Sequence, residues 1–192
     1  MHKTLDGTLW LDVALSGAEG YAGALFEAYA IRTLQGGGEF TLRRLEGAAT
    51  KVVVLVLKAM KTDPIEIESN KLTTAGVDYH QLRVKDGNPL LLWPTTTNFP
   101  TFDCFYFHQN GTVYLLQMTI SKNHPLKNSG AKNAKDFFDK MFGEAKPKKY
   151  KAVFVVPDDL AAIYKAQQFE GQAQKTAIDM SPHFDQWVMG LP

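Results

Sequence analysis

The sequence predicts an α/β domain with a mixed central β-sheet flanked by helices. Helical and strand-like segments follow one another in the order helix, strands, hairpin, helix, strand and helix, which is typical of this class. The chain has 192 residues, the usual size of one domain. We therefore expect residues 1–192 to form a single domain with its core at about residues 16–156. The sequence is equally compatible with a fragment of a longer protein.

The composition is that of a globular protein whose net charge is too small to create a strong electrostatic field around the whole molecule. Hydrophobic residues make up 45% of the chain, charged residues 21%, and the net charge is +1, so any contact with nucleic acid must depend on local charge. Cys104 is the only cysteine; we expect a buried thiol and no cysteine-ligated metal. Asp6 and Asp12 interrupt the first apolar run, which argues against a signal peptide. We expect no membrane contact, because no stretch is long enough to span a bilayer.

A helix is predicted from about residue 16 to the glycines at 36–38. Ser16 and Glu19 form a capping-box pattern, and a glycine run is a helix stop signal. Apolar residues at helical spacing predict its buried stripe. The members of this predicted stripe are Tyr21, Ala24, Leu25, Ala28 and Ile31.

Strands are predicted on both sides of a polar middle segment. Residues 39–45 follow the helix as a strand. The run "KVVVLVLKAM" at residues 51–60 is continuous and β-branched, which predicts a central strand. A short strand is expected near residues 78–84, and residues 89–94 form a short apolar element.

A β-hairpin is predicted at residues 103–121. Asn110-Gly111 joins two apolar runs, which is a strong hairpin signal. In the second run the apolar side chains alternate with polar ones, so the polar ones share a face. That polar face carries Gln117, Thr119 and Ser121. A helix at 131–145, a strand at 152–157 and a short helix after Pro157 complete the prediction.

The hairpin brings candidate metal ligands together. Antiparallel pairing places Asp103, at the start of the first strand, near Gln117 in the second. Carboxylate and amide oxygens are the hard ligands that suit Mg²⁺ or Mn²⁺, and Glu27 approaches from the first helix. Such an ion promotes phosphodiester hydrolysis. Lys122 or His124, just past the strand, would then neutralise charge or orient water.

Three blocks carry a resemblance to a known family. They are "GALFEAYAIRTLQGGGEFTLRRL", "NFPTFDCFYF" and "YLLQMTISKNHPLK", in that order. Together they resemble the nuclease-like C-terminal domains of Crinkler-type effectors and retrotransposon hot spot proteins, which belong to the PD-(D/E)xK, restriction-endonuclease-like superfamily. The resemblance covers roughly residues 20–156. It implies a restriction-endonuclease-like core and Mg²⁺- or Mn²⁺-dependent hydrolysis of nucleic acid, with DNA favoured over RNA. It also implies a secreted effector or an intracellular protein, often in a host nucleus.

The resemblance assigns a role to each candidate residue. Glu27 matches the helix glutamate and Asp103 the motif aspartate. Gln117 stands at the position of the second acid and Thr119 at that of the lysine. The amide oxygen of Gln117 can still ligate a metal, whereas Thr119 supplies no positive charge unless Lys122 substitutes for it. The alternative is therefore a catalytically inactive nuclease fold that binds DNA or a host protein.

Structural interpretations stand beside these functional ones. Glu27 is also suited to an ion pair, with Arg32, Arg43 or Arg44 as the partner. Asp103 is suited to accept hydrogen bonds from the threonine-rich loop at a strand start, and His124, before a proline, to shape a loop.

A basic segment follows the hairpin. Residues 127–151 contain eight lysines and three acidic residues, which suits phosphate contacts or, in "KPKKYK", nuclear import. A solvated helix face and loop is the alternative. The candidate nucleic-acid contacts are Lys127, Lys132, Lys146, Lys148 and Lys149.

Overall fold

The computed structural model describes residues 19–47, 51–57, 65–67, 90–94, 101–108, 112–145, 149–171 and 179–192. Its main feature is an eight-stranded mixed sheet. The strands are β1 (Gly38–Arg44), β2 (Val52–Leu57), β3 (Ile65–Ile67), β4 (Leu90–Pro94), β5 (Cys104–Phe107), β6 (Val113–Met118), β8 (Tyr150–Pro157) and β10 (Phe184–Leu191). Their order across the sheet is β2-β1-β10-β8-β6-β5-β4-β3.

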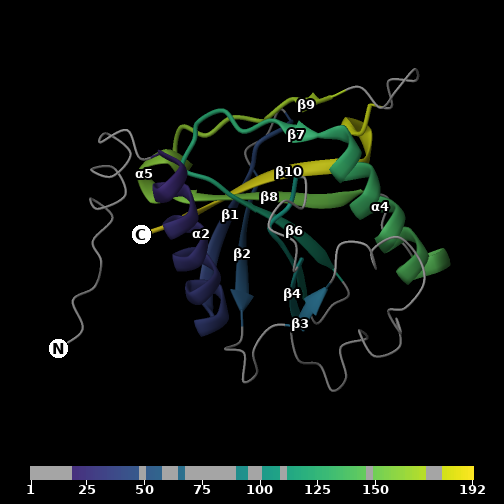
Figure 1. The fold of residues 1–192 in the computed structure, drawn as a ribbon, viewed down its shortest axis with the longest axis horizontal. Coiled ribbons are helices and arrows are strands. Elements are labelled where there is room, and N and C mark those ends of the chain that lie inside the picture. Colours follow the sequence, from purple (N-terminus) through teal and green to yellow (C-terminus); the bar gives the residue numbers. More distant parts are fainter. Residues whose placement is uncertain are drawn as a thin grey trace.

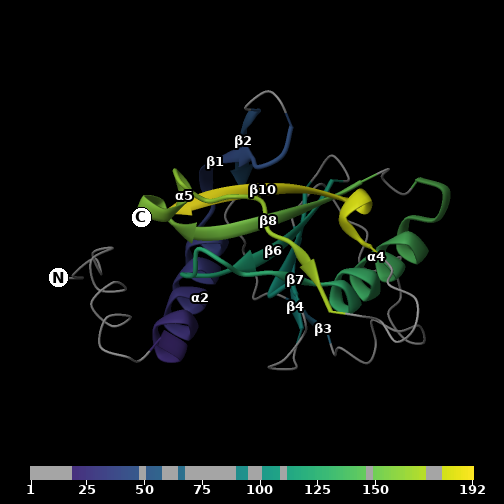
Figure 2. The ribbon, with the colours of Figure 1, turned by 90° about the horizontal axis from the view of Figure 1, so that it is seen from above.

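Helices flank this sheet, which confirms the predicted α/β class. They are α2 (Glu19–Gly36), α4 (Asn128–Phe142), the short α5 (Asp158–Ala161) and the 3₁₀ turns Gly143–Ala145 and Ser181–His183. Two short strands, β7 (Leu126–Lys127) and β9 (Phe169–Glu170), pair separately and in parallel. α2 and α4 lie toward opposite sides of the molecule in both views (Figures 1 and 2). No helix in the described ranges is long and apolar enough to cross a membrane.

The centre of the sheet combines an antiparallel meander with parallel strands. β4, β5 and β6 pair antiparallel in chain order, which confirms the predicted hairpin. α4 then connects β6 to β8, and those two strands are parallel, because a parallel pair needs a crossover of this kind. β10 joins β8 in parallel and β1 in antiparallel fashion. The carboxyl ends of β6, β8 and β10 therefore lie at one edge of the sheet.

Each face of the sheet has its own apolar core. On one face Leu115 of β6 packs with Phe138 of α4. On the other face Leu116 packs with Phe26 of α2. Successive strand residues point to opposite faces, so neighbouring leucines of β6 serve different cores. The buried thiol of Cys104, as predicted, belongs to the α2 side.

The predicted buried stripe of α2 was wrong. Tyr21 is 65% exposed, Ala24 and Ala28 are exposed, and Leu25 and Ile31 are only half-buried. The side chains that reach full burial are Ala22, Phe26, Ala30 and Leu34. Apolar residues surround much of this helix, so spacing alone did not select a face. The sheet buries the face that carries the large Phe26 ring.

The predicted central strand at residues 51–60 was also wrong in its position. The described part, β2, is an edge strand. Val52, Val54 and Val56 are each more than half exposed, whereas Leu55 and Leu57 are buried. A β-branched run favours a strand, but it does not show whether both faces become covered.

The C-terminal segment supplies a strand that no sequence pattern predicted. β10 follows the predicted core of residues 16–156 and lies between β1 and β8. A side chain on Gly190 would meet Asp158 Oδ1 at 2.1 Å, so glycine permits α5 to approach this strand. Ser16 and the strand expected near residues 78–84 lie outside the described residues.

Candidate functional site

A cavity of about 620 Å³ lies where the carboxyl end of β6 faces α2. Its lining comes from α2, the residue before β5, the end of β6 and the loop that follows β6. Five of the six predicted catalytic residues line it. They are Glu27, Asp103, Gln117, Thr119 and His124.

Asp103 and Gln117 meet through the register of the hairpin. Cys104 pairs with Leu116, so the preceding residue, Asp103, faces Gln117. The Asp103 amide donates to the Leu116 carbonyl at 2.8 Å. Gln117 Nε2 donates to Asp103 Oδ2 at 2.8 Å, and the Met118 amide donates to the same oxygen at 2.6 Å. The predicted proximity of the two side chains is therefore confirmed.

The alternation along β6 explains why the polar side chain reaches this site. Leu116 and Met118 belong to the core under α2, and Ile120 packs against it. Gln117 lies between them in β6, lines the cavity and is 5% exposed. Its amide nitrogen is engaged by Asp103 and, at 3.4 Å, by the Met118 carbonyl. The amide oxygen is thus the atom left to face a ligand.

The two carboxylates of the cavity have raised pKa values. Burial raises the pKa of Asp103 to about 7, the Met118 hydrogen bond opposes this rise, and the charge of Glu27 adds to it. Burial also raises the pKa of Glu27. Among the described residues that line the cavity there is no lysine or arginine. A proton or a cation would therefore stabilise this pair of carboxylates.

Thr119 and His124 also line the cavity. Thr119 is 6% exposed, and its Oγ1 accepts from the Ser121 amide at 3.0 Å. The same oxygen lies 3.4 Å from His124 Nδ1. Burial, together with the charge of Lys127, lowers the pKa of His124. This shift favours the neutral imidazole of His124.

Lys122 is exposed and is not among the lining residues. Its backbone is held by Gln167, whose Nε2 donates to the Lys122 carbonyl at 3.1 Å while its Oε1 accepts from the His124 amide at 2.7 Å. The Gln186 side chain bonds both backbone groups of Gln167 at 2.8 Å. Sequence reasoning missed Gln167 and Gln186, because neither stands in a motif or near the hairpin in the chain.

Two of the arginines proposed as partners of Glu27 are engaged elsewhere. Arg43 Nη2 donates to the Ala161 and Tyr164 carbonyls, and Arg44 pairs with Asp185. Among the described residues no ion pair joins Glu27 to these arginines. Asp103 accepts from β6, as described above, and residues 95–100 of the threonine-rich loop lie outside the described residues.

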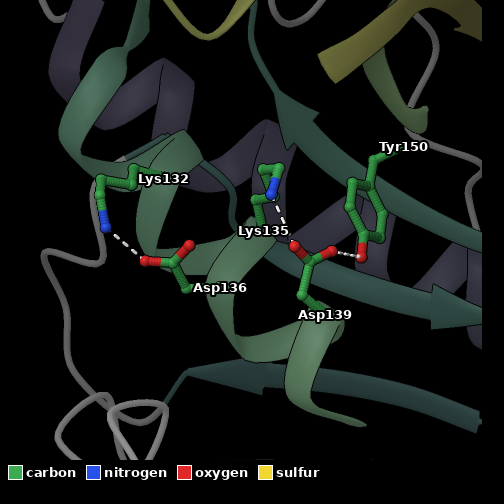
Figure 3. Close-up of polar contacts among 5 residues, drawn as sticks. All are labelled: Lys132, Lys135, Asp136, Asp139 and Tyr150. Carbon is green, nitrogen blue, oxygen red and sulfur yellow. Dashed lines mark hydrogen bonds and ion pairs between the residues drawn. The ribbon is translucent and has the colours of Figure 1, made fainter. Parts of the chain in front are cut away.

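The predicted nucleic-acid lysines do not form one group around the cavity. Lys132 pairs with Asp136 along α4 (Figure 3). Lys149 Nζ lies 3.5 Å from Asp185, and Lys127 is exposed. Lys146 and Lys148 lie outside the described residues.

The donor set of the cavity fits a hard divalent cation. Asp103 and Glu27 offer carboxylate oxygens and Gln117 offers an amide oxygen, which are ligand types that Mg²⁺ and Mn²⁺ accept. The pKa values of both carboxylates are raised, chiefly by burial, and a bound cation would offset the cost of burying their charge. In the described part of the chain no three His, Cys, Asp or Glu side chains are grouped as metal ligands. The glutamine oxygen would therefore be an essential member of the set.

Comparison of the chain with protein-family models, with curated proteins and with solved structures gives no significant match. The assignment of the site consequently depends on its geometry and on the sequence resemblance.

Proposed function

We propose that the cavity is the site of a divalent-metal-dependent nuclease that hydrolyses phosphodiester bonds, with DNA favoured over RNA. The observation that carries this proposal is the convergence of Glu27, Asp103 and Gln117 from three elements on one cavity. A phosphodiester is anionic, so a cavity with two carboxylates and no lysine or arginine among its described lining residues would repel it. A bound cation removes that repulsion, and for this reason we favour metal-dependent chemistry.

Each residue has a definite task in this proposal. Asp103, Glu27 and the Gln117 amide oxygen would hold the cation. When bound, Mg²⁺ or Mn²⁺ supplies charge neutralisation and lowers the pKa of nearby water. The neutral imidazole of His124 is suited to accept a proton from an attacking water or to orient it. We assign this task to His124 and not to Lys122, because only His124 lines the cavity.

Nuclease assays on supercoiled DNA and on single-stranded RNA test the proposal. We expect cleavage in Mg²⁺ or Mn²⁺, none in EDTA, and a loss of at least about 100-fold in Asp103→Asn, because a metal ligand is removed. Asp136→Asn, which alters an exposed carboxylate on α4, is the matched control and should cleave normally. His124→Ala should lower kcat more than Lys122→Ala does. Equal cleavage by the native protein and Asp103→Asn would contradict a catalytic role.

The second candidate function is an inactive nuclease fold that binds DNA or a host protein. Thr119 favours it, because the threonine occupies the usual lysine position and its hydroxyl is already engaged within the loop. This function predicts metal-independent, salt-dependent DNA binding without cleavage. If the native protein binds neither DNA nor RNA, a protein partner becomes the expected target.

A further inference from the structure

A second charged feature lies at the opposite end of β6 and β8 from the cavity. Arg44 ends β1, Lys51 precedes β2, Lys149 precedes β8 and Lys151 is the second residue of β8. Arg44 and Lys149 contact Asp185 of β10, and Lys151 pairs with it in the sheet. Lys51 lies close enough to Lys151 to lower its pKa. We call this group, Arg44, Lys51, Lys149 and Lys151 with Asp185, the basic surface. The basic surface brings together residues from chain segments about a hundred residues apart.

Several contacts hold the basic surface together. Arg44 Nη2 lies 2.7 Å and Lys149 Nζ 3.5 Å from Asp185 Oδ1. Lys151 stands beside Asp185 in the β8–β10 register. The Arg44 amide donates to the Lys51 carbonyl at 2.8 Å. Lys149 therefore lies beside Lys151 at the start of β8, and Arg44 and Lys51 approach from β1 and β2, beyond β10.

Two aromatic rings fix the position of the Lys151 ammonium group. Its Nζ lies 4.9 Å from the centre of the Tyr114 ring and 5.6 Å from that of Trp187. Cations are attracted to the faces of such rings. Because both rings are almost fully buried, they are not available to stack on bases. Their effect is to hold a positive charge at the surface.

The positive charge of this surface is not balanced within the described residues. Four cations share one carboxylate, and Asp185 already contacts two of them. Burial lowers the pKa of Lys151, the charge of Lys51 lowers it further, and Asp185 only partly opposes these effects. Arg44 Nε is buried and has no hydrogen-bond partner. An anion would relieve this repulsion.

The basic surface and the cavity are connected by the same strands. Tyr114 pairs with Lys151, and Met118, which lines the cavity, pairs with Val155. Four residues of strand separate the two sites along β8, which corresponds to about 13 Å. Successive phosphates of one strand are spaced by about 3.4 Å along the helix axis of B-DNA. A segment of about four nucleotides therefore spans the distance.

We propose that the basic surface binds the phosphate backbone of nucleic acid and aligns it with the cavity. The alignment rests on the proposed nuclease function, whereas the binding itself does not. The recognition is by charge and carries no base specificity, because no exposed aromatic or amide group belongs to the surface.

Fluorescence anisotropy of a labelled 20-base-pair DNA, in EDTA and over a series of salt concentrations, tests the binding. Each phosphate contact contributes about 0.9 to the slope of log K against log salt concentration. The double variant Lys51→Gln with Lys149→Gln should bind more weakly and lose about 1.8 from that slope. Lys140→Gln with Lys165→Gln, which changes two exposed lysines elsewhere, is the matched control and should keep the native slope.

The variant Asp185→Asn tests the proposal through an expected gain in DNA binding instead of a loss. Removal of the carboxylate leaves the four cations uncompensated, so DNA should bind more tightly, by about threefold to tenfold at 100 mM salt. Simple destabilisation would weaken binding instead. Three results would overturn the proposal. The salt slope could be unchanged in the Lys51/Lys149 variant, or the control could lose as much slope as that variant does. The protein could also bind a polyglutamate peptide in preference to DNA. Because EDTA prevents metal-dependent cleavage, a failure of the nuclease assay does not affect this result.

Discussion

Two groups of carboxylates in this protein have opposite surroundings. On α4, Asp139 accepts from Lys135 at 2.6 Å and from the buried Tyr150 hydroxyl at 2.7 Å, and Asp136 pairs with Lys132 (Figure 3). In the cavity, Asp103 accepts only from neutral amide groups and faces Glu27, which adds a further negative charge.

The difference separates a structural carboxylate from one available to a ligand. Asp139 joins the carboxyl end of α4 to the start of β8, and its negative charge is compensated by Lys135. Asp103 is held in place equally well, yet its charge is not compensated, and its pKa is raised to about 7. A buried carboxylate pair without a cation is typical of functional sites. The following predictions test this contrast, in order of decreasing effect.

The largest expected effect is on stabilisation by metal. Mg²⁺ at about 100 times its Kd should raise the free energy of unfolding of the native protein by about 2.7 kcal/mol. Asp103→Asn should show little of this gain, because it loses a charged ligand, whereas Asp136→Asn should keep it. Urea denaturation with and without Mg²⁺ measures the difference. A full gain in Asp103→Asn would exclude Asp103 as a ligand.

A smaller effect is expected from the structural carboxylate. Asp139→Ala leaves the buried Tyr150 hydroxyl without its acceptor, which should lower the free energy of unfolding by about 2 kcal/mol. Asp136→Ala removes only an exposed pair within α4 and should cost about 0.5 kcal/mol or less. Urea denaturation of both variants, without metal, gives the comparison. Equal losses would show that Asp139 does not anchor α4 to β8.

The last expected effect is a pH dependence of the metal-free protein. The pKa of Asp103 is raised from 3.8 to about 7 on folding, so the folded state binds more protons between these values. Its stability should therefore fall as the pH rises from about 4 to 7. Asp103→Asn lacks this contribution, and the shift of His124 cancels when the two proteins are compared. Parallel stability curves for the native protein and Asp103→Asn would contradict the raised pKa.

The local chemistry of the cavity was predictable because it depends on a hairpin. An Asn-Gly turn and the pairing that it imposes suffice to place Gln117 opposite Asp103. The predicted approach of Glu27 is also observed, although the buried stripe predicted for its helix was wrong. Helical periodicity did not predict this position of Glu27.

The remaining features required the tertiary structure. Nothing local distinguishes the edge strand β2 from a central strand, or indicates that β10 fills the position between β1 and β8. Those positions follow from the packing of distant segments against the two cores. The same packing brings Gln167 to the loop that carries His124. It also brings Arg44 and Lys51 to the lysines at the start of β8. The alternation of side chains within a hairpin follows from backbone geometry. Contacts between residues far apart in the chain depend instead on which surfaces pack together in the folded protein.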